Sequence, residues 1–184
     1  MRITGGTAKG LQLKFPPKSQ IRPTTDMVRE AIFSILASLA SRWSRILDLY
    51  AGTGALGIEA LSRDADWVDF VDQEPRCCAI IKQNLEKSGF AQKAHVYCCN
   101  VSKALTFLDG NYDIIFADPP YSDTTIGNLL MQLDNSKYIN DESLIVIPHA
   151  SRSPLADSYG GWHLIKERRH GDTCISIYCR EGYN

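Results

Sequence analysis

Residues 46–57 read Ile-Leu-Asp-Leu-Tyr-Ala-Gly-Thr-Gly-Ala-Leu-Gly, and this stretch decides the fold that we expect. The apolar run at 46–50 predicts a buried strand, and the glycines after it permit a tight turn and close backbone approach. A helix is expected to open after the turn, and the first N–H groups of a helix have no partner within it. The stretch therefore predicts a polar ligand bound at the end of a strand.

Two kinds of cofactor fit this turn. Residues 52–57 match the glycine fingerprint of dinucleotide-binding folds, and Asp72 lies about twenty residues further on, where that fingerprint has a ribose-binding acid. Asp48, four residues before Gly52, favours another cofactor. A carboxylate there suits a ligand with a cationic amino-acid portion and no pyrophosphate, and S-adenosylmethionine is such a ligand. We predict S-adenosylmethionine, with an NAD-dependent dehydrogenase as the alternative.

Asp72 and its neighbour Gln73 are the expected contacts to the nucleoside part of the cofactor. The Asp72 carboxylate can accept hydrogen bonds from both ribose hydroxyls, and Gln73 can contact the adenosine. Asp72 and Asp48 each also have a structural interpretation that involves no ligand. Asp72 could instead cap a helix that begins at Pro75, and Asp48 could be an ordinary residue at a strand end.

The chain around this turn alternates between strand-like and helix-like segments. Apolar runs occupy 46–50, 67–71, 96–99, 114–117 and 144–147, and two further runs at 162–166 and 173–179 read as a hairpin. Helices are expected after an N-cap offered by Thr24-Thr25-Asp26 and from Pro75 to Gly89, whereas 151–161 reads as a loop or a short, poorly formed helix. This order predicts an α/β, Rossmann-like, mostly parallel seven-stranded sheet with helices on both faces and a closing antiparallel hairpin.

Residues 118–121, Asp-Pro-Pro-Tyr, follow one of these strands and carry the most specific chemical signal. An exocyclic amine of a base is a poor nucleophile, because its lone pair is delocalised into the ring. The Asp118 carboxylate and the Pro119 carbonyl can accept its two hydrogens and direct the lone pair. Pro120 restricts the backbone, and Tyr121 offers a ring on which an extruded base can stack. These four residues are the predicted catalytic residues; an Asp-Pro-Pro turn with an exposed tyrosine is the structural alternative.

Charge is distributed unevenly along the chain. Residues 1–25 hold five basic residues and no acidic one, so that with a net charge of −1 for all 184 residues the rest of the chain carries −6. We expect a single domain over 1–184, with residues 1–23 as a basic arm that contains a small β-ribbon and binds RNA phosphates. A solvated, flexible terminus explains the same charges equally well.

The remaining composition indicates a soluble cytoplasmic protein, and a monomer is the default. No apolar run approaches the roughly 20 residues that span a bilayer, and the N-terminus lacks the pattern of a secretory signal. The six cysteines include two adjacent pairs and read as reduced thiols. The four histidines form no short-spaced pair of ligands, so no metal site is predicted.

Several segments together resemble the RsmD family of bacterial 16S rRNA guanine-N2 methyltransferases, which belong to the Class I S-adenosylmethionine-dependent enzymes. They are RITGGTAKGLQL (2–13), RPTTDMVREAIFSIL (22–36), DLYAGTGALGIEALSR (48–63), FADPPY (116–121) and ERRHGDTCISIY (167–178). Asp-Pro-Pro-Tyr is also found in adenine-N6 methyltransferases, so it does not distinguish the two families. The resemblance to the RsmD family in particular therefore depends on the N-terminal segments. The chain departs from the family pattern at Tyr50, Thr53 and His170, where Phe, Ser and Tyr are usual.

The resemblance implies methylation of a guanine N2 amine in 16S rRNA, free or in a small-subunit particle. It implies that the cofactor lies against the glycine turn and the ends of the neighbouring strands, with Asp118 shared between cofactor and base. The complete set of cofactor contacts that we expect is Asp48, Tyr50, Ala51, Gly52, Thr53, Gly54, Asp72, Gln73 and Asn100, and that of RNA contacts is Arg2, Lys9, Lys14, Arg22 and Thr24. The alternatives are adenine-N6 methylation of DNA or RNA, and a non-catalytic RNA-binding or ribosome-assembly factor.

Overall fold

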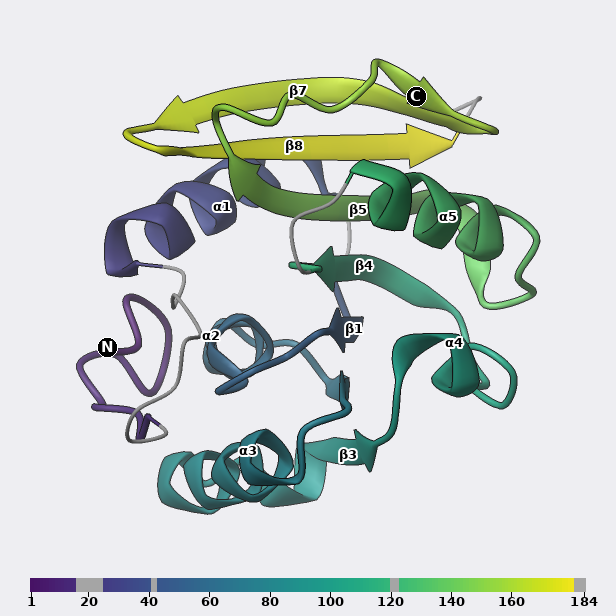
Figure 1. Ribbon diagram of the computed structural model, residues 1–184. Helices are drawn as coiled ribbons and strands as arrows, with labels where there is room; N and C mark the ends of the chain where they lie inside the picture. The colour runs from purple at the N-terminus through teal and green to yellow at the C-terminus, as the bar shows by residue number, and fades with distance from the viewer. Residues whose placement is uncertain (16–24, 41–42, 120–122, 181–184) are drawn as a thin grey trace.

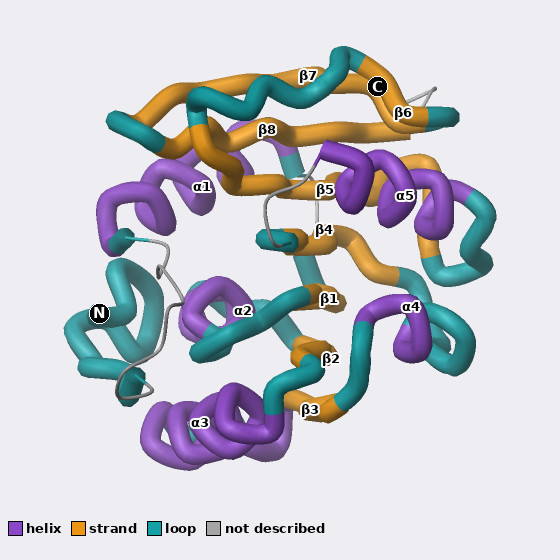
Figure 2. Tube along the Cα trace, viewed as in Figure 1, coloured by secondary structure: helices purple, strands orange, loops and turns teal. Residues whose placement is uncertain are grey.

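The computed structural model describes residues 1–15, 25–40, 43–119 and 123–180, and these residues form one sheet with helices on both faces (Figures 1 and 2). The sheet has eight strands in the order β3-β2-β1-β4-β5-β8-β7-β6. Their bounds are β1 Arg45–Leu49, β2 Trp67–Asp72, β3 Ala94–Cys98, β4 Tyr112–Ala117, β5 Ile139–Ala150, β6 Ser158–Tyr159, β7 Trp162–His170 and β8 Thr173–Arg180.

The directions of the strands confirm the predicted Rossmann-like arrangement. The strands β1 to β5 pair in parallel, whereas β8 pairs antiparallel with both β5 and β7. The expected number of seven strands is wrong, because β6 pairs antiparallel with the start of β7. That pairing uses the turn at Gly160 and Gly161, where Gly160 has a φ of +59°. Part of the segment expected to be a loop or a poor helix is thus a short edge strand.

Helices cover the two faces of the sheet unequally (Figure 1). One face is covered by α1 (Asp26–Leu39), α2 (Ala55–Ser62) and α3 (Pro75–Ser88), and the other by α4 (Val101–Ala104) and α5 (Asp123–Asp134). A 3-10 turn, Ala91–Lys93, comes between α3 and β3 in the chain. Successive residues of β1 show the division, because Ile46 is buried against the first group of helices and Leu47 against the second. The sequence prediction of a sheet covered on both faces is confirmed.

The helix boundaries follow the expected capping residues. Thr25 is the N-cap of α1, and its side chain accepts a hydrogen bond from the Val28 N–H at 3.3 Å. Pro75 opens α3, and Gly89 ends it with a φ of +79°. In the part of the chain that the structure describes, no helix has the length and apolar character needed to span a membrane.

Residues 1–15, here called the N-terminal segment, pack against α2 and α3. Ile3 and Leu13 are only 1% and 4% exposed and belong to the core on that face. The Thr7 N–H donates to the carbonyl oxygen of Ser62 at 2.7 Å. A solvated, flexible terminus is therefore the wrong interpretation of the described residues 1–15.

The N-terminal segment is held by contact with α2 and by a few backbone hydrogen bonds of its own, such as that from the Ile3 N–H to the Leu11 carbonyl at 3.0 Å. Within residues 1–15 the expected β-ribbon is reduced to one isolated antiparallel bridge between Arg2 and Gln12. Gly6 has a φ of +75°, and a Cβ there would lie 1.7 Å from the Ser62 carbonyl oxygen. Only glycine fits this approach of two backbones, because any side chain would collide with α2. Arg22 and Thr24, expected to contact RNA, lie outside the described residues.

Candidate active site

The glycine turn joins β1 to α2, and its conformation depends on left-handed backbone angles. Gly52 and Gly54 have φ angles of +57° and +75°, and Tyr50 adopts +56°. The Gly54 N–H donates to the Ala51 carbonyl at 2.7 Å, which closes the turn. A Cβ at Gly57 would lie 2.3 Å from the ring of Phe70, so this glycine lets α2 pack directly on β2. These contacts confirm the strand, turn and helix expected for residues 46–57.

Asp72, at the end of β2, is bonded to the glycine turn. One of its carboxylate oxygens accepts from the Gly52 N–H and the other from the Glu74 N–H, each at 2.8 Å. Glu74 is the N-cap residue of α3, so Asp72 supports both the turn and the start of that helix. Gln73 is exposed beside it. The two interpretations of Asp72, support of α3 and contact with a ligand, are compatible in this geometry.

Asp48 is buried under the first turn of α2. It is 2% exposed, and its carboxylate accepts from the Gly57 N–H at 2.9 Å. Burial raises the pKa of Asp48 well above its usual value, and the charges of Asp72 and Asp118 raise it further. Three carboxylates therefore lie near one another at the carboxyl ends of β1, β2 and β4, and their field favours a cation at this edge of the sheet.

The Asp-Pro-Pro-Tyr motif begins directly after β4, at the same edge. Asp118 is partly buried and Pro119 is buried, whereas Pro120 and Tyr121 lie outside the described residues. Because β4 pairs with β1 in parallel, with Leu49 opposite Ala117, the strands deliver Asp118 beside the glycine turn. The structure thus brings together the acids that the sequence analysis predicted for catalysis and for the cofactor.

Asn100 follows β3, which pairs in parallel with β2, and is the N-cap residue of α4. Its side-chain oxygen accepts from the Lys103 N–H at 2.8 Å, and the residue is exposed after β3. To contact the adenine amine as expected, this oxygen would have to accept a second hydrogen bond in addition to the one from the Lys103 N–H. Asn100 remains a predicted contact at the outer side of the site.

Asn84 is a residue of this region that the sequence analysis missed. It is fully buried in α3, and its amide nitrogen donates to the Thr53 carbonyl at 3.0 Å and to the Lys14 carbonyl at 3.1 Å. Its oxygen accepts from the Lys14 N–H at 2.8 Å. Asn84 thereby connects the N-terminal segment to the glycine turn. The available signal was a polar side chain between Ile81 and Leu85, on the apolar face of the helix.

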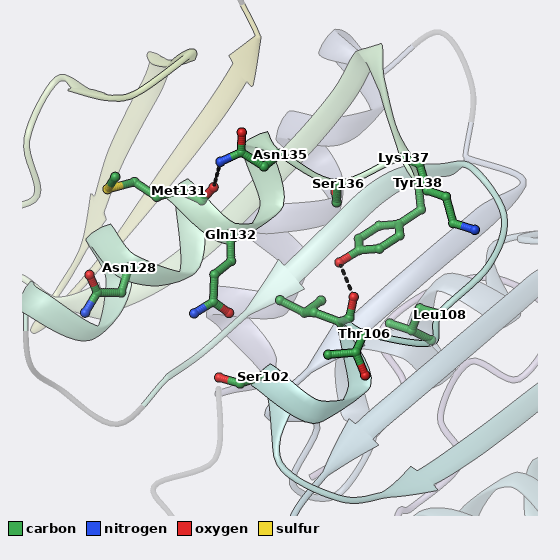
Figure 3. A pocket seen from close by; sticks show the side chains of 11 residues that line it. Ser102, Thr106, Leu108, Asn128, Met131, Gln132, Asn135, Ser136, Lys137 and Tyr138 are labelled. Carbon is green, nitrogen blue, oxygen red and sulfur yellow. Dashed lines mark hydrogen bonds between the residues drawn. The ribbon is translucent and has the colours of Figure 1, made fainter.

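A groove of about 890 Å³ lies elsewhere, between α4 and α5 (Figure 3). Figure 3 shows amide and hydroxyl groups around it, including Asn128, Gln132 and Ser102, and at its base the Tyr138 hydroxyl donates to the Leu105 carbonyl at 3.2 Å. Among the described residues that line this groove, none is a predicted cofactor or catalytic residue. The candidate active site is therefore the acidic edge beside the glycine turn and not this groove.

Comparison with known proteins places these features in a family. A family profile described as "Conserved hypothetical protein 95" matches residues 1–179. The chain is 32% identical to "Ribosomal RNA small subunit methyltransferase D" of Escherichia coli strain K12, over 98% of this chain and 90% of the relative. The chain belongs to this family, the RsmD family. The resemblance read from the sequence motifs is confirmed.

Two further matches of this RsmD family member also extend over nearly the full length of the chain. "Putative rRNA methyltransferase YlbH" of Bacillus subtilis is 33% identical over 99% of this chain and all of the relative. The solved structure titled "Putative methyltransferase yhhF from Escherichia coli" superposes with a TM-score of 0.86 at 30% identity, covering 99% of this chain and 98% of that one. The N-terminal segment is included in these matches, so it is part of the shared architecture.

Proposed function

We propose that this RsmD family member transfers the methyl group of S-adenosylmethionine to the exocyclic N2 amine of a guanine in 16S rRNA. The observation that carries the proposal is the position of Asp118 and Pro119 beside the glycine turn, at the carboxyl end of β4. Ligands of open α/β sheets bind at this edge. The names of the relatives support rRNA as the substrate class.

The described residues fit S-adenosylmethionine through the charges at this edge. Asp48, Asp72 and Asp118 form a cluster of acidic side chains, and a ligand with a positive sulfur and a positive amino group would be attracted to their charged forms. Asp72 would accept from the ribose hydroxyls, while the turn from Tyr50 to Gly54 would lie along the ligand. When bound, S-adenosylmethionine supplies a methyl group already activated by the sulfonium charge.

The protein's own contribution is to orient the amine. The Asp118 carboxylate and the Pro119 carbonyl would each accept one amine hydrogen, so that the lone pair points at the methyl carbon. Tyr121 would stack against the base that leaves its helix or loop. No covalent bond between enzyme and substrate is needed, because the methyl passes directly from sulfur to nitrogen.

Product analysis distinguishes this function from its alternatives. Purified protein is incubated with isotope-labelled S-adenosylmethionine and either free 16S rRNA or small-subunit particles, and the RNA is digested to nucleosides for mass spectrometry. We expect labelled N2-methylguanosine. Labelled N6-methyladenosine would support the adenine enzyme instead, and no labelled nucleoside from either substrate would support a non-catalytic assembly factor.

Asp72→Ala is expected to weaken cofactor binding. The loss of a hydrogen bond to a charged group corresponds to about 1–3 kcal/mol, and the variant also removes the acceptor for the Gly52 N–H. Calorimetric titration with S-adenosylhomocysteine measures the change. Glu74→Ala is the matched control, because Glu74 is exposed and its bond to Asp72 uses only the backbone. Unchanged affinity in Asp72→Ala would limit Asp72 to support of the turn and of α3.

Basic residues of the N-terminal segment are proposed to contact RNA phosphates. Arg2, Lys9 and Lys14 are exposed on the segment, which α2 and α3 hold close to the glycine turn. Each single replacement by alanine should reduce the slope of log affinity against log salt by about 0.7–0.9, the value for one lost phosphate contact. Point variants are suitable here, because deletion of the segment would also remove the buried Ile3 and Leu13.

Filter-binding or fluorescence titrations of 16S rRNA over a range of salt concentrations measure this slope. Lys137→Ala is the control, because Lys137 is an exposed lysine on the groove at the other face of the sheet. If Arg2→Ala, Lys9→Ala and Lys14→Ala all left the slope unchanged, these three positive charges would have no role in RNA binding. We further propose that the chain acts as a monomer, with the small ribosomal subunit or its rRNA as its partner.

A further inference from the structure

Three potential metal ligands meet where β5, β8 and β7 lie side by side. His149 of β5 is opposite Cys174 of β8, and in the next row of the same sheet Ser176 of β8 is opposite Glu167 of β7. Opposed residues, and those two positions apart, point to the same face of a sheet. As a result one ring nitrogen of His149, the Cys174 sulfur and one Glu167 carboxylate oxygen lie within 4.8 Å of one another.

The hydrogen bonds of His149 direct a lone pair into this cluster. Its Nδ1 lies 2.9 Å from the Ser153 carbonyl oxygen and 3.2 Å from that of Ala150. Carbonyl oxygens only accept, so Nδ1 carries the proton and the neutral ring presents an unprotonated Nε2 to the cluster. A histidine that binds a metal ion typically donates its other N–H to a carbonyl or carboxylate in this way.

The hydroxyl of Ser176 cannot satisfy both acceptors that face it. Its oxygen lies 2.9 Å from His149 Nε2 and 3.0 Å from a Glu167 carboxylate oxygen, and it has one proton to donate. A positive charge between Nε2 and the carboxylate would remove this conflict. Those two atoms are 3.9 Å apart. Two ligands at 2.0–2.2 Å from one tetrahedral ion lie about 3.3–3.6 Å apart, so binding needs the Glu167 carboxylate to move a few tenths of an ångström toward His149.

We propose that His149, Cys174 and Glu167 bind a Zn²⁺ ion, with a water molecule at the fourth position. Nitrogen, sulfur and carboxylate ligands are the set that zinc prefers. Glu167 is 45% exposed in its side chain and provides a route from solvent, whereas His149 and Cys174 are buried. Binding would release the thiol proton of Cys174. Arg169, in the same row as Cys174, donates from Nε to the Gly171 carbonyl in the adjoining turn.

The prediction of no metal site rested on ligand spacing along the chain, whereas the sheet brings these ligands together from three strands. The cluster lies toward the carboxyl end of β5, which pairs with β4 and therefore ends at the same edge as Asp118. An ion there would tie the closing hairpin to the strand next to the candidate active site. This inference is independent of the proposed methyl transfer.

Zinc binding is tested on the full chain after removal of any affinity tag and treatment with a chelator. Calorimetry should show one Zn²⁺ bound per chain, and added Zn²⁺ should raise Tm because it binds the folded state. Substitution with Co²⁺ should give the absorption of a thiolate-bound ion. Cys174→Ser should abolish that absorption, and Glu167→Gln, at an exposed position, should weaken binding by at least about tenfold.

Cys179→Ser is the matched control, because Cys179 is a buried cysteine of the same strand that faces the opposite core. It should bind Zn²⁺ as the unaltered protein does. Binding that survives both Cys174→Ser and Glu167→Gln would overturn the assignment. The absence of Zn²⁺ binding in the unaltered protein would overturn it as well.

Discussion

Asp118→Ala is expected to reduce methyl transfer by at least about 10²–10³-fold, the cost of removing one preorganised polar group that stabilises a transition state. The carboxylate is proposed to hold an amine hydrogen as the lone pair turns toward the methyl group, an interaction that matters most in the transition state. Single-turnover assays with saturating rRNA and S-adenosylmethionine measure the step itself. Because turnover should fall while substrate is saturating, weaker binding alone would not explain the loss.

The controls for this variant separate chemistry from folding. Asp118→Ala should retain a cooperative thermal transition, since Asp118 lies after β4 and outside the sheet. Asp141→Ala removes an exposed acid from β5 and should leave the activity unchanged. Asp118→Asn is less decisive, because the side-chain oxygen of asparagine can still accept a hydrogen bond from the amine. Substantial turnover by Asp118→Ala would rule out the proposed orientation of the amine.

Glu59→Ala is expected to destabilise the protein by about 3–5 kcal/mol, the cost of removing one partner from a buried charged network. Glu59 of α2 is fully buried, and its carboxylate accepts from the Thr4 and Gly5 N–H groups at 2.8 Å. It also accepts from the Arg63 Nε at 2.9 Å, and the buried Arg29 Nε lies 3.8 Å away. Without the carboxylate, these donors would lose an acceptor inside the protein.

Thermal unfolding measures this effect, with an expected fall in Tm of roughly 6–20 °C at 2–4 °C per kcal/mol for a chain of this size. Trypsin should also cleave at Lys9 and Lys14 faster than in the unaltered protein, because the N-terminal segment loses its contacts with α2. Glu86→Ala, an exposed glutamate of α3, is the control and should change neither quantity. A Glu59→Ala variant as stable as the control would show that the segment is held without this network, by the packing of Ile3 and Leu13 and by its hydrogen bonds to Ser62 and Asn84.

The hydrogen-bond partners of Glu59 could not be predicted from the sequence. In the sequence it is one acid among the apolar residues of a short helix, and nothing local indicates that Thr4 and Gly5 are its partners. Likewise, the charge of residues 1–25 predicted a basic arm but left open whether it was folded. The hydrogen bonds from α2 and α3 decide that residues 1–15 belong to the body.

The sequence by itself determined the alternation of strands and helices from β1 to β5, the glycine turn, and the positions of Asp48 in β1 and Asp118 after β4. These features depend on periodicity, on glycine and proline, and on the position of a residue relative to the end of its own strand, all of which are local. Tertiary structure alone decided that Asp48 is buried against Gly57, that Asn84 joins Lys14 to Thr53, and that His149 meets Cys174 and Glu167. Each of these depends on hydrogen bonds or strand pairing between distant residues, whose partners are chosen by the packing of the whole sheet and its helices.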